Sequence, residues 1–156
     1  MTGPSAPQVG EEAPDFELAG TDGPFRLSDH RGERVVLLFS PGDNTPVCTK
    51  QFCSYRDRPE DFASLAATVV GISAQDVASH EDFIHTNALT VPLLADVDKT
   101  VAAAYGADGA FTQRAVIVID EQGIVRHRHD HLLGLDYQTV DELSSALDSI
   151  PGVAAH

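Results

Sequence analysis

Short apolar runs of strand length alternate along the chain with segments that have the spacing of amphipathic helices. We expect the clearest strands at residues 34–39, 68–72, 92–95 and 115–119, where branched apolar side chains follow one another. Strands that alternate with helices of about ten residues predict a three-layer α/β domain with a central sheet.

Turn-forming residues predict two hairpins. The first joins residues 16–18 to residues 25–27. The second follows the strand 115–119 through the turn Asp120–Gly123 and returns as a strand from 124 to about 130. Because the partners in a hairpin run antiparallel, the second hairpin predicts a mixed sheet and not a purely parallel one.

Helices are expected where proline or a capping residue precedes an apolar stripe. Ser79 and Asp82 have capping-box spacing, which predicts a helix start at Ser79. The expected helices cover 45–55, about 60–66, 79–85, 100–105 and 140–150.

The chain has no internal repeat and no long linker, so residues 1–156 are expected to form a single domain. Proline and glycine near the start predict a loose N-terminal arm. We expect residues 1–9 to form this arm and the loose conformation to continue to about residue 12.

Charge and hydropathy narrow the range of functions. Ten Lys and Arg against 24 Asp and Glu give a net charge of −14, which disfavours nucleic acid and anionic membrane surfaces as partners. No run reaches the roughly 18 apolar residues of a membrane span, and the first residues do not resemble a signal peptide. A cytoplasmic protein is therefore expected, in which two cysteines are reactive, redox-cycling or buried rather than a structural staple.

Cys48 falls in the first turn of the helix expected after the strand 34–39. Unpaired backbone N–H groups at a helix start stabilise a thiolate, which is the nucleophilic form of cysteine. Thr45 is placed to direct its hydroxyl into the same pocket, and Pro41 to shield the sulfur from water. The alternative is that Cys48 is only a small buried apolar residue.

The spacing Pro41-x-x-x-Thr45-x-x-Cys48 resembles the active-site motif of the peroxiredoxins. The longer string from Thr45 to Asp57 is similar to the peroxiredoxin Q branch, also called bacterioferritin comigratory protein. The resemblance extends from about Gly10 to Leu147.

This resemblance implies a thioredoxin-like fold in which a central mixed sheet is flanked by helices and preceded by a β-hairpin. It implies a peroxidase, monomeric or a weak homodimer, that reduces hydroperoxides without a cofactor or a metal. It also implies that the Arg114 side chain reaches the reactive sulfur. There its positive charge stabilises the thiolate and the negative charge that develops on the leaving oxygen. Otherwise Arg114 is an exposed residue at a strand start.

Cys53 is the only other cysteine, and hence the only intramolecular partner for a Cys48 sulfenic acid. Residues five apart in a helix have Cα atoms roughly 8–9 Å apart, whereas a disulfide closes only below about 7 Å. The helix must therefore unwind to form the disulfide, which thioredoxin or a similar dithiol would then reduce. The alternative is an inert Cys53 with resolution by an outside thiol.

Other polar groups are interpreted as structural. His127, His129 and His131 alternate along one expected strand, a spacing that suits a transition metal, but interleaved charged residues favour a solvated strand face or edge. Asp96 and Asp98 are interpreted as surface residues of a turn, and His80 and His85 as structural or exposed residues of a helix.

Two other functions compete with peroxide reduction. One is a thiol–disulfide oxidoreductase of similar fold, although that chemistry favours cysteines separated by two residues and this chain has four between them. The other is a metal-binding or partner-binding module in which the cysteines are incidental.

Overall fold

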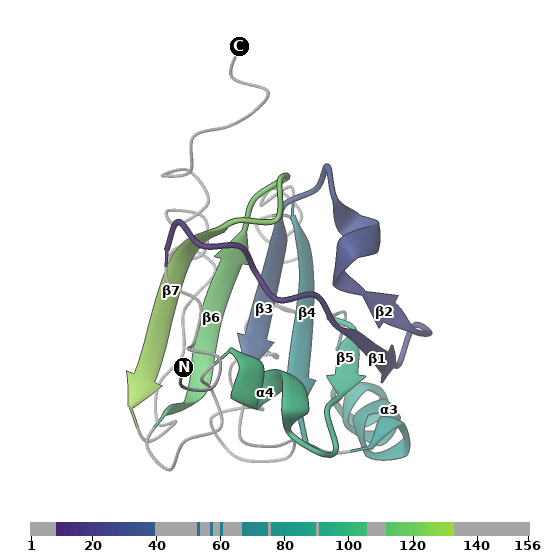
Figure 1. Ribbon diagram of the computed structural model, residues 1–156. Coiled ribbons are helices and arrows are strands. Elements are labelled where there is room, and N and C mark those ends of the chain that lie inside the picture. Colours follow the sequence, from purple (N-terminus) through teal and green to yellow (C-terminus); the bar gives the residue numbers. More distant parts are fainter. Residues whose placement is uncertain are drawn as a thin grey trace.

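A seven-stranded mixed sheet organises the part of the chain that the computed structural model describes. The described residues are 9–39, 53, 57, 60, 67–74, 76–89, 91–105 and 112–132, of which 112–114 and 129–132 are described by their backbone alone. The strand order is β2-β1-β5-β4-β3-β6-β7 (Figure 1). The elements are β1 (Glu17–Gly20), β2 (Phe25–Arg26), the 3-10 helix η1 (Leu27–His30), β3 (Val35–Phe39), β4 (Thr68–Ser73), α3 (Val77–Asn87), β5 (Leu93–Ala95), α4 (Thr100–Ala104), β6 (Thr112–Ile119) and β7 (Val125–Leu132).

Three parallel strands form the centre of the sheet. β3 pairs with β4, and β4 pairs with β5, both in parallel, whereas β6 and β7 extend the sheet antiparallel on one side and β1 and β2 on the other. Every residue of β3 is buried, as expected for a strand covered on both faces. The mixed sheet and both hairpins that the sequence predicts are therefore confirmed.

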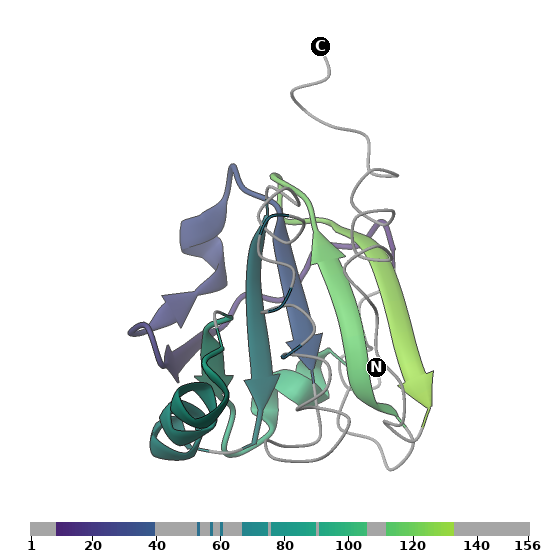
Figure 2. The ribbon, with the colours of Figure 1, turned by 180° about the vertical axis from the view of Figure 1, so that it is seen from behind.

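The two faces of the sheet carry separate apolar layers. On one face Val36, Leu38, Val116 and Val118 pack with Phe83 of α3. On the other face the buried residues include members of η1, α4 and the N-terminal segment, with Tyr105 among them. Figures 1 and 2 show α4 and that segment on one side and α3 at the lower end of the sheet. No helix among the described residues is long and apolar enough to cross a membrane.

The segment that leads into β1 is tied to the β6–β7 hairpin. Backbone amides of Gly10 and Ala13 donate to the carbonyls of Val125 and Gly123, and the Val125 amide donates to the carbonyl of Glu11. The prediction of a loose arm up to about residue 12 is therefore wrong from residue 10 onwards. Residues 1–8 lie outside the described residues.

The start of α3 differs from the sequence prediction in which side chain caps it, and the start of α4 is capped by a carboxylate that precedes it. The N-cap of α3 is Asp76, whose carboxylate accepts from the amide of Ser79, so Ser79 lies inside the helix and does not cap it. The start of α4 is held by Asp96, which is buried and accepts from the amides of Val101 and Ala102. The interpretation of Asp96 as a surface residue is wrong, whereas Asp98 is exposed.

Asp120 holds the turn between β6 and β7. Its buried carboxylate accepts from the amides of Gln122 and Ile124 and, at 2.7 Å, from Nε of Arg126. Gly123 closes the turn with a φ of +83°, a conformation that favours glycine. Burial acts to raise the pKa of Asp120, but the bonds from Arg126 and the two amides outweigh burial and hold the pKa below its ordinary value.

Replacing Asp120 with asparagine is expected to lower the free energy of unfolding by about 1–3 kcal/mol near neutral pH, since charge-assisted hydrogen bonds are lost in a buried turn. The pKa of Asp120 is lower in the folded than in the unfolded chain. Its stabilising contribution is therefore present above the unfolded value of about 4 and is lost as pH falls through the folded value. Urea denaturation of both proteins from near-neutral to strongly acidic pH measures this difference.

Asp98→Asn, at an exposed carboxylate, is the matched control and should change stability little at any pH. A difference between wild type and Asp120→Asn that is as large in strong acid as near neutrality would contradict this account of the turn.

Candidate functional site

The carboxyl ends of the three parallel strands meet at one edge of the sheet. Phe39, the last residue of β3, pairs with Ile72, and Ser73, the last residue of β4, pairs with Ala95 of β5. In open α/β sheets, ligands bind at the edge formed by the carboxyl ends of the strands. The chain leaves this edge at Phe39 and enters the segment that carries Cys48.

Arg114 lies at the same edge although it is far from Cys48 in sequence. β6 runs antiparallel to β3, with Ala115 opposite Phe39, so the backbone of Arg114 lies one position beyond the last residue pair. It thus lies beside the point where the chain leaves β3. Its backbone pairs on the other side with His131 of β7.

Pro41, Thr45 and Cys48 lie outside the described residues, as does the side chain of Arg114. Their assigned roles remain predictions. The structure brings together the backbone of Arg114 and the strand end that precedes the Pro41–Cys48 motif.

Cys53 is helical and half-buried, in agreement with a helix expected over residues 45–55. Its carbonyl accepts from the amide of Asp57 at 2.9 Å, which is the hydrogen bond of one helical turn. The side chain packs against the apolar layer that contains Phe83.

Asn87, in the last turn of α3, contacts the sulfur of Cys53. The Cys53 thiol donates to Oδ1 of Asn87 at an Sγ–O distance of 4.0 Å. The other end of the amide is fixed, because Nδ2 donates to the carbonyl of Phe83 at 3.1 Å. Sequence reasoning missed Asn87: it is separated from Cys53 by 34 positions, and nothing in its neighbourhood distinguishes it.

His80 is fully buried next to the carboxyl end of β4. Its Nε2 atom lies 3.4 Å from the hydroxyl oxygen of Ser73, which is also buried. His80 is therefore buried and not exposed, which agrees with a structural residue, and His85 on the same helix is exposed.

The three alternating histidines belong to the last strand of the described sheet, β7. The backbones of His127, His129 and His131 pair with Val118, Val116 and Arg114. Among the described strands β7 is the outermost, but the ring of His127 is half-buried with Nε2 covered, so His127 does not belong to a solvated face. The side chains of the other two lie outside the described residues, and within those described no three metal-ligating side chains gather.

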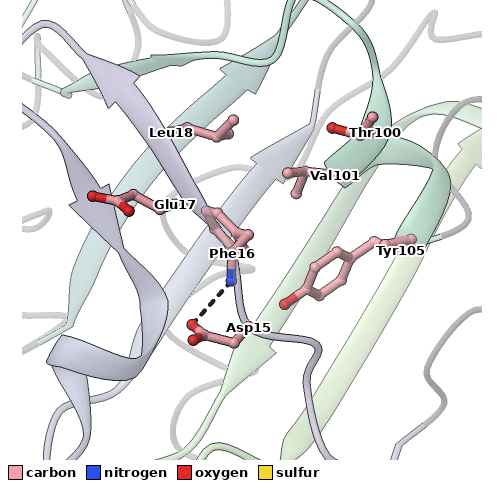
Figure 3. Close-up of a pocket in the computed structure, with 8 residues that line it drawn as sticks. Asp15, Phe16, Glu17, Leu18, Thr100, Val101 and Tyr105 are labelled. Carbon is pink, nitrogen blue, oxygen red and sulfur yellow. Dashed lines mark hydrogen bonds between the residues drawn. The ribbon is translucent and has the colours of Figure 1, made fainter.

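An open hollow of about 300 Å³ lies between the segment that leads into β1 and α4 (Figure 3). Its carboxylates are already engaged: Asp15 accepts from the amides of Phe16 and Ser28, and Glu17 pairs with Arg26. Its lining residues are Asp15, Phe16, Glu17, Leu18, Thr100, Val101, Ala104 and Tyr105.

Tyr105 connects this hollow to the carboxyl end of β3. The centroid of its ring lies 5.5 Å from the centroid of the Phe39 ring, and its hydroxyl donates to the carbonyl of Pro14. Burial raises the pKa of Tyr105, so the phenol stays protonated and keeps this hydrogen bond. We assign Tyr105 a packing role beneath the strand that leads to Cys48.

Comparison with known proteins gives one consistent family. Residues 9–128 match the model of the AhpC/TSA family. The chain is 40% identical over 128 residues to a peroxiredoxin of Thermoplasma volcanium, which covers 76% of this chain and 63% of that protein. It is 39% identical over 127 residues to the chloroplastic peroxiredoxin Q of Oryza sativa subsp. japonica, covering 78% and 58%. The chain thus spans somewhat less than two thirds of these relatives' length.

Solved structures agree with the fold. The crystal structure of peroxidoxin BcpB from Mycobacterium tuberculosis superposes with a TM-score of 0.78 at 31% identity, covering 94% of this chain and 99% of that one. A yeast mitochondrial 1-Cys peroxiredoxin superposes with a TM-score of 0.81 at 25% identity, covering 91% and 75%. The expected thioredoxin-like fold is therefore confirmed. Sequence and structure together show that the chain belongs to the AhpC/TSA family, in its peroxiredoxin Q or bacterioferritin comigratory protein branch.

Proposed function

We propose that the chain is a thiol-dependent peroxidase that reduces hydrogen peroxide and organic hydroperoxides through Cys48. Membership of the AhpC/TSA family supports thiol peroxidase chemistry, and the Pro41, Thr45 and Cys48 spacing supports this nucleophile. The observation that carries the proposal is the sheet register that brings Arg114 to the edge where β3 leads into the Cys48 segment.

In the first step the Cys48 thiolate attacks one oxygen of the hydroperoxide, so that an S–O bond forms while the O–O bond breaks. The sulfur is oxidised to a sulfenic acid, and the other oxygen leaves and takes up a proton to become water or an alcohol. Arg114 favours the thiolate and the negative charge on the leaving oxygen. Thr45 and Pro41 orient the peroxide and keep water from the sulfur.

In the second step the thiolate of Cys53 attacks the sulfenic sulfur of Cys48. The S–S bond forms, the S–O bond breaks, and the oxygen leaves as water. Because the bond cannot close in an intact helix, the helix opens locally between the two cysteines. Thioredoxin or a similar dithiol then reduces the disulfide by thiol exchange. We place this cycle in the cytoplasm, with the protein as a monomer or a weak homodimer.

Rapid mixing of the reduced protein with an equimolar amount of hydrogen peroxide tests the first step. Acid quenching, thiol alkylation and mass spectrometry follow the reaction, since the chain has no tryptophan to report it by fluorescence. We expect stoichiometric Cys48 oxidation much faster than that of free cysteine under the same conditions. A rate no faster than free cysteine, combined with efficient reduction of insulin disulfides, would favour a thiol–disulfide oxidoreductase instead.

A further inference from the structure

We propose that Asn87 is a latch that holds Cys53 in its folded, non-attacking position and so sets the rate of disulfide formation. The proposal rests on the function proposed above and assigns a positioning residue to its second step. It starts from a polar contact between two described side chains, the 4.0 Å approach of the Cys53 sulfur to Oδ1 of Asn87.

The orientation of the Asn87 amide follows from its second contact. Nδ2 donates to the carbonyl of Phe83 one turn earlier in α3, so the oxygen of the amide is the atom left to face Cys53. Phe83 is fully buried and belongs to the apolar layer against which Cys53 packs. The latch is therefore anchored in the core of the domain, while Cys53 belongs to the helix that must open.

An amide oxygen holds a thiol but not a thiolate. Oδ1 carries no hydrogen, so it accepts from the S–H group and offers nothing to a negatively charged sulfur. Only the thiolate attacks a sulfenic acid. The contact with Asn87 thus holds Cys53 in place until the helix opens, after which Cys53 is free to reach Cys48.

Weakening this latch should shift the protein toward the locally open form. The formation of the disulfide should become faster, since the open form is the one in which the cysteines meet. Over-oxidation of Cys48 by excess peroxide should decrease, because the sulfenic acid exists for a shorter time before it is captured. The initial attack on peroxide should change little as long as the folded form predominates.

The direct test measures how readily Cys53 reacts in a Cys48→Ser background, where it is the only thiol. Asn87→Ala removes the accepting oxygen and also the bond from Nδ2 to the Phe83 carbonyl, a loss that the higher helix propensity of alanine offsets. We expect the alkylation rate of Cys53 by iodoacetamide to rise by about three- to tenfold; a tenfold rise corresponds to about 1.4 kcal/mol. Asn87→Leu, which keeps the volume of the side chain, should give the same direction of change.

Two further variants separate the latch from a loss of helix stability. Asn87→Asp retains an accepting oxygen and should leave the rate at or below that of the wild-type residue. Thr86→Ala alters an exposed residue of the same helical turn and should leave the rate unchanged.

The second test follows disulfide formation with both cysteines present. After one rapid addition of peroxide, Asn87→Ala should form the Cys48–Cys53 disulfide three- to tenfold faster than wild type. It should also need correspondingly more peroxide to become over-oxidised. Equal rates in wild type and Asn87→Ala, or equal acceleration in Thr86→Ala, would overturn the latch and leave the proposed peroxidase intact. A wild-type protein whose Cys48 does not react with peroxide would instead overturn the proposed function, and the alkylation test would still decide the latch.

Discussion

Replacing Cys48 with serine is expected to lower peroxide reduction by about 10⁴-fold or more, to the background rate of the assay. A serine hydroxyl is not ionised near neutral pH and is a poor nucleophile toward an O–O bond, whereas a thiolate at a helix start is ionised and polarisable. The measurement is peroxide consumption with a thioredoxin system in excess, which reports many turnovers.

The matched control keeps the other cysteine and tests the fold. Circular dichroism and the urea midpoint of Cys48→Ser should match those of wild type, because serine and cysteine are similar in size. Residual activity above a few per cent of wild type would mean that Cys53 or a non-thiol group attacks peroxide, and the assignment of Cys48 would fail.

Replacing Cys53 with serine is expected to separate the two steps of the cycle. The first oxidation of Cys48 should keep its rate, because Cys53 lies in the helix without taking part in the attack. Turnover supported by thioredoxin should fall by at least about tenfold, because no intramolecular disulfide forms and the sulfenic acid persists. Comparison of a single-turnover experiment with steady-state peroxide consumption measures both quantities on the same variant.

A persistent sulfenic acid has its own signature. Mass spectrometry should show sulfinic acid on Cys48 of the Cys53→Ser variant at peroxide concentrations that leave wild type unmodified. Full multiple-turnover activity in this variant would show that an outside thiol resolves the sulfenic acid, and Cys53 would then be an inert packed residue.

The sheet could be predicted from sequence because its central strands have an unambiguous composition. β3, β4 and β6 are apolar runs that a solvated position would not tolerate, and the turn Asp120–Gly123 fixes the antiparallel return of β7. The start of α3 at Ser79 is a wrong prediction, because Asp76 lies three positions earlier, is an equally good capping residue and is the one that caps the helix. Only the fold shows which carboxylate or hydroxyl accepts a hydrogen bond from the backbone amides in the first turn of the helix.

The candidate site also has one part that the sequence predicts and another part that only the fold shows. The spacing of Pro41, Thr45 and Cys48 is local, so sequence alone is enough to propose it. The position of Arg114 depends on which strand pairs with β3, and the contact between Cys53 and Asn87 depends on how α3 packs. Contacts of this kind join residues that are distant in the chain, and no local pattern of side chains encodes them.

The parallel pairing of β3 with β4 limits the entropy that the opened segment can gain. Five residue pairs, from Val35 with Thr68 to Phe39 with Ile72, tie together the strands before and after the segment that carries both cysteines. A segment held at both ends samples far fewer conformations than a free chain end of the same length. In the proposed opening, the segment therefore moves as a loop whose two ends stay fixed by the sheet. The two cysteines stay at high effective concentration, and the helix re-forms while the β3–β4 pairing is still intact.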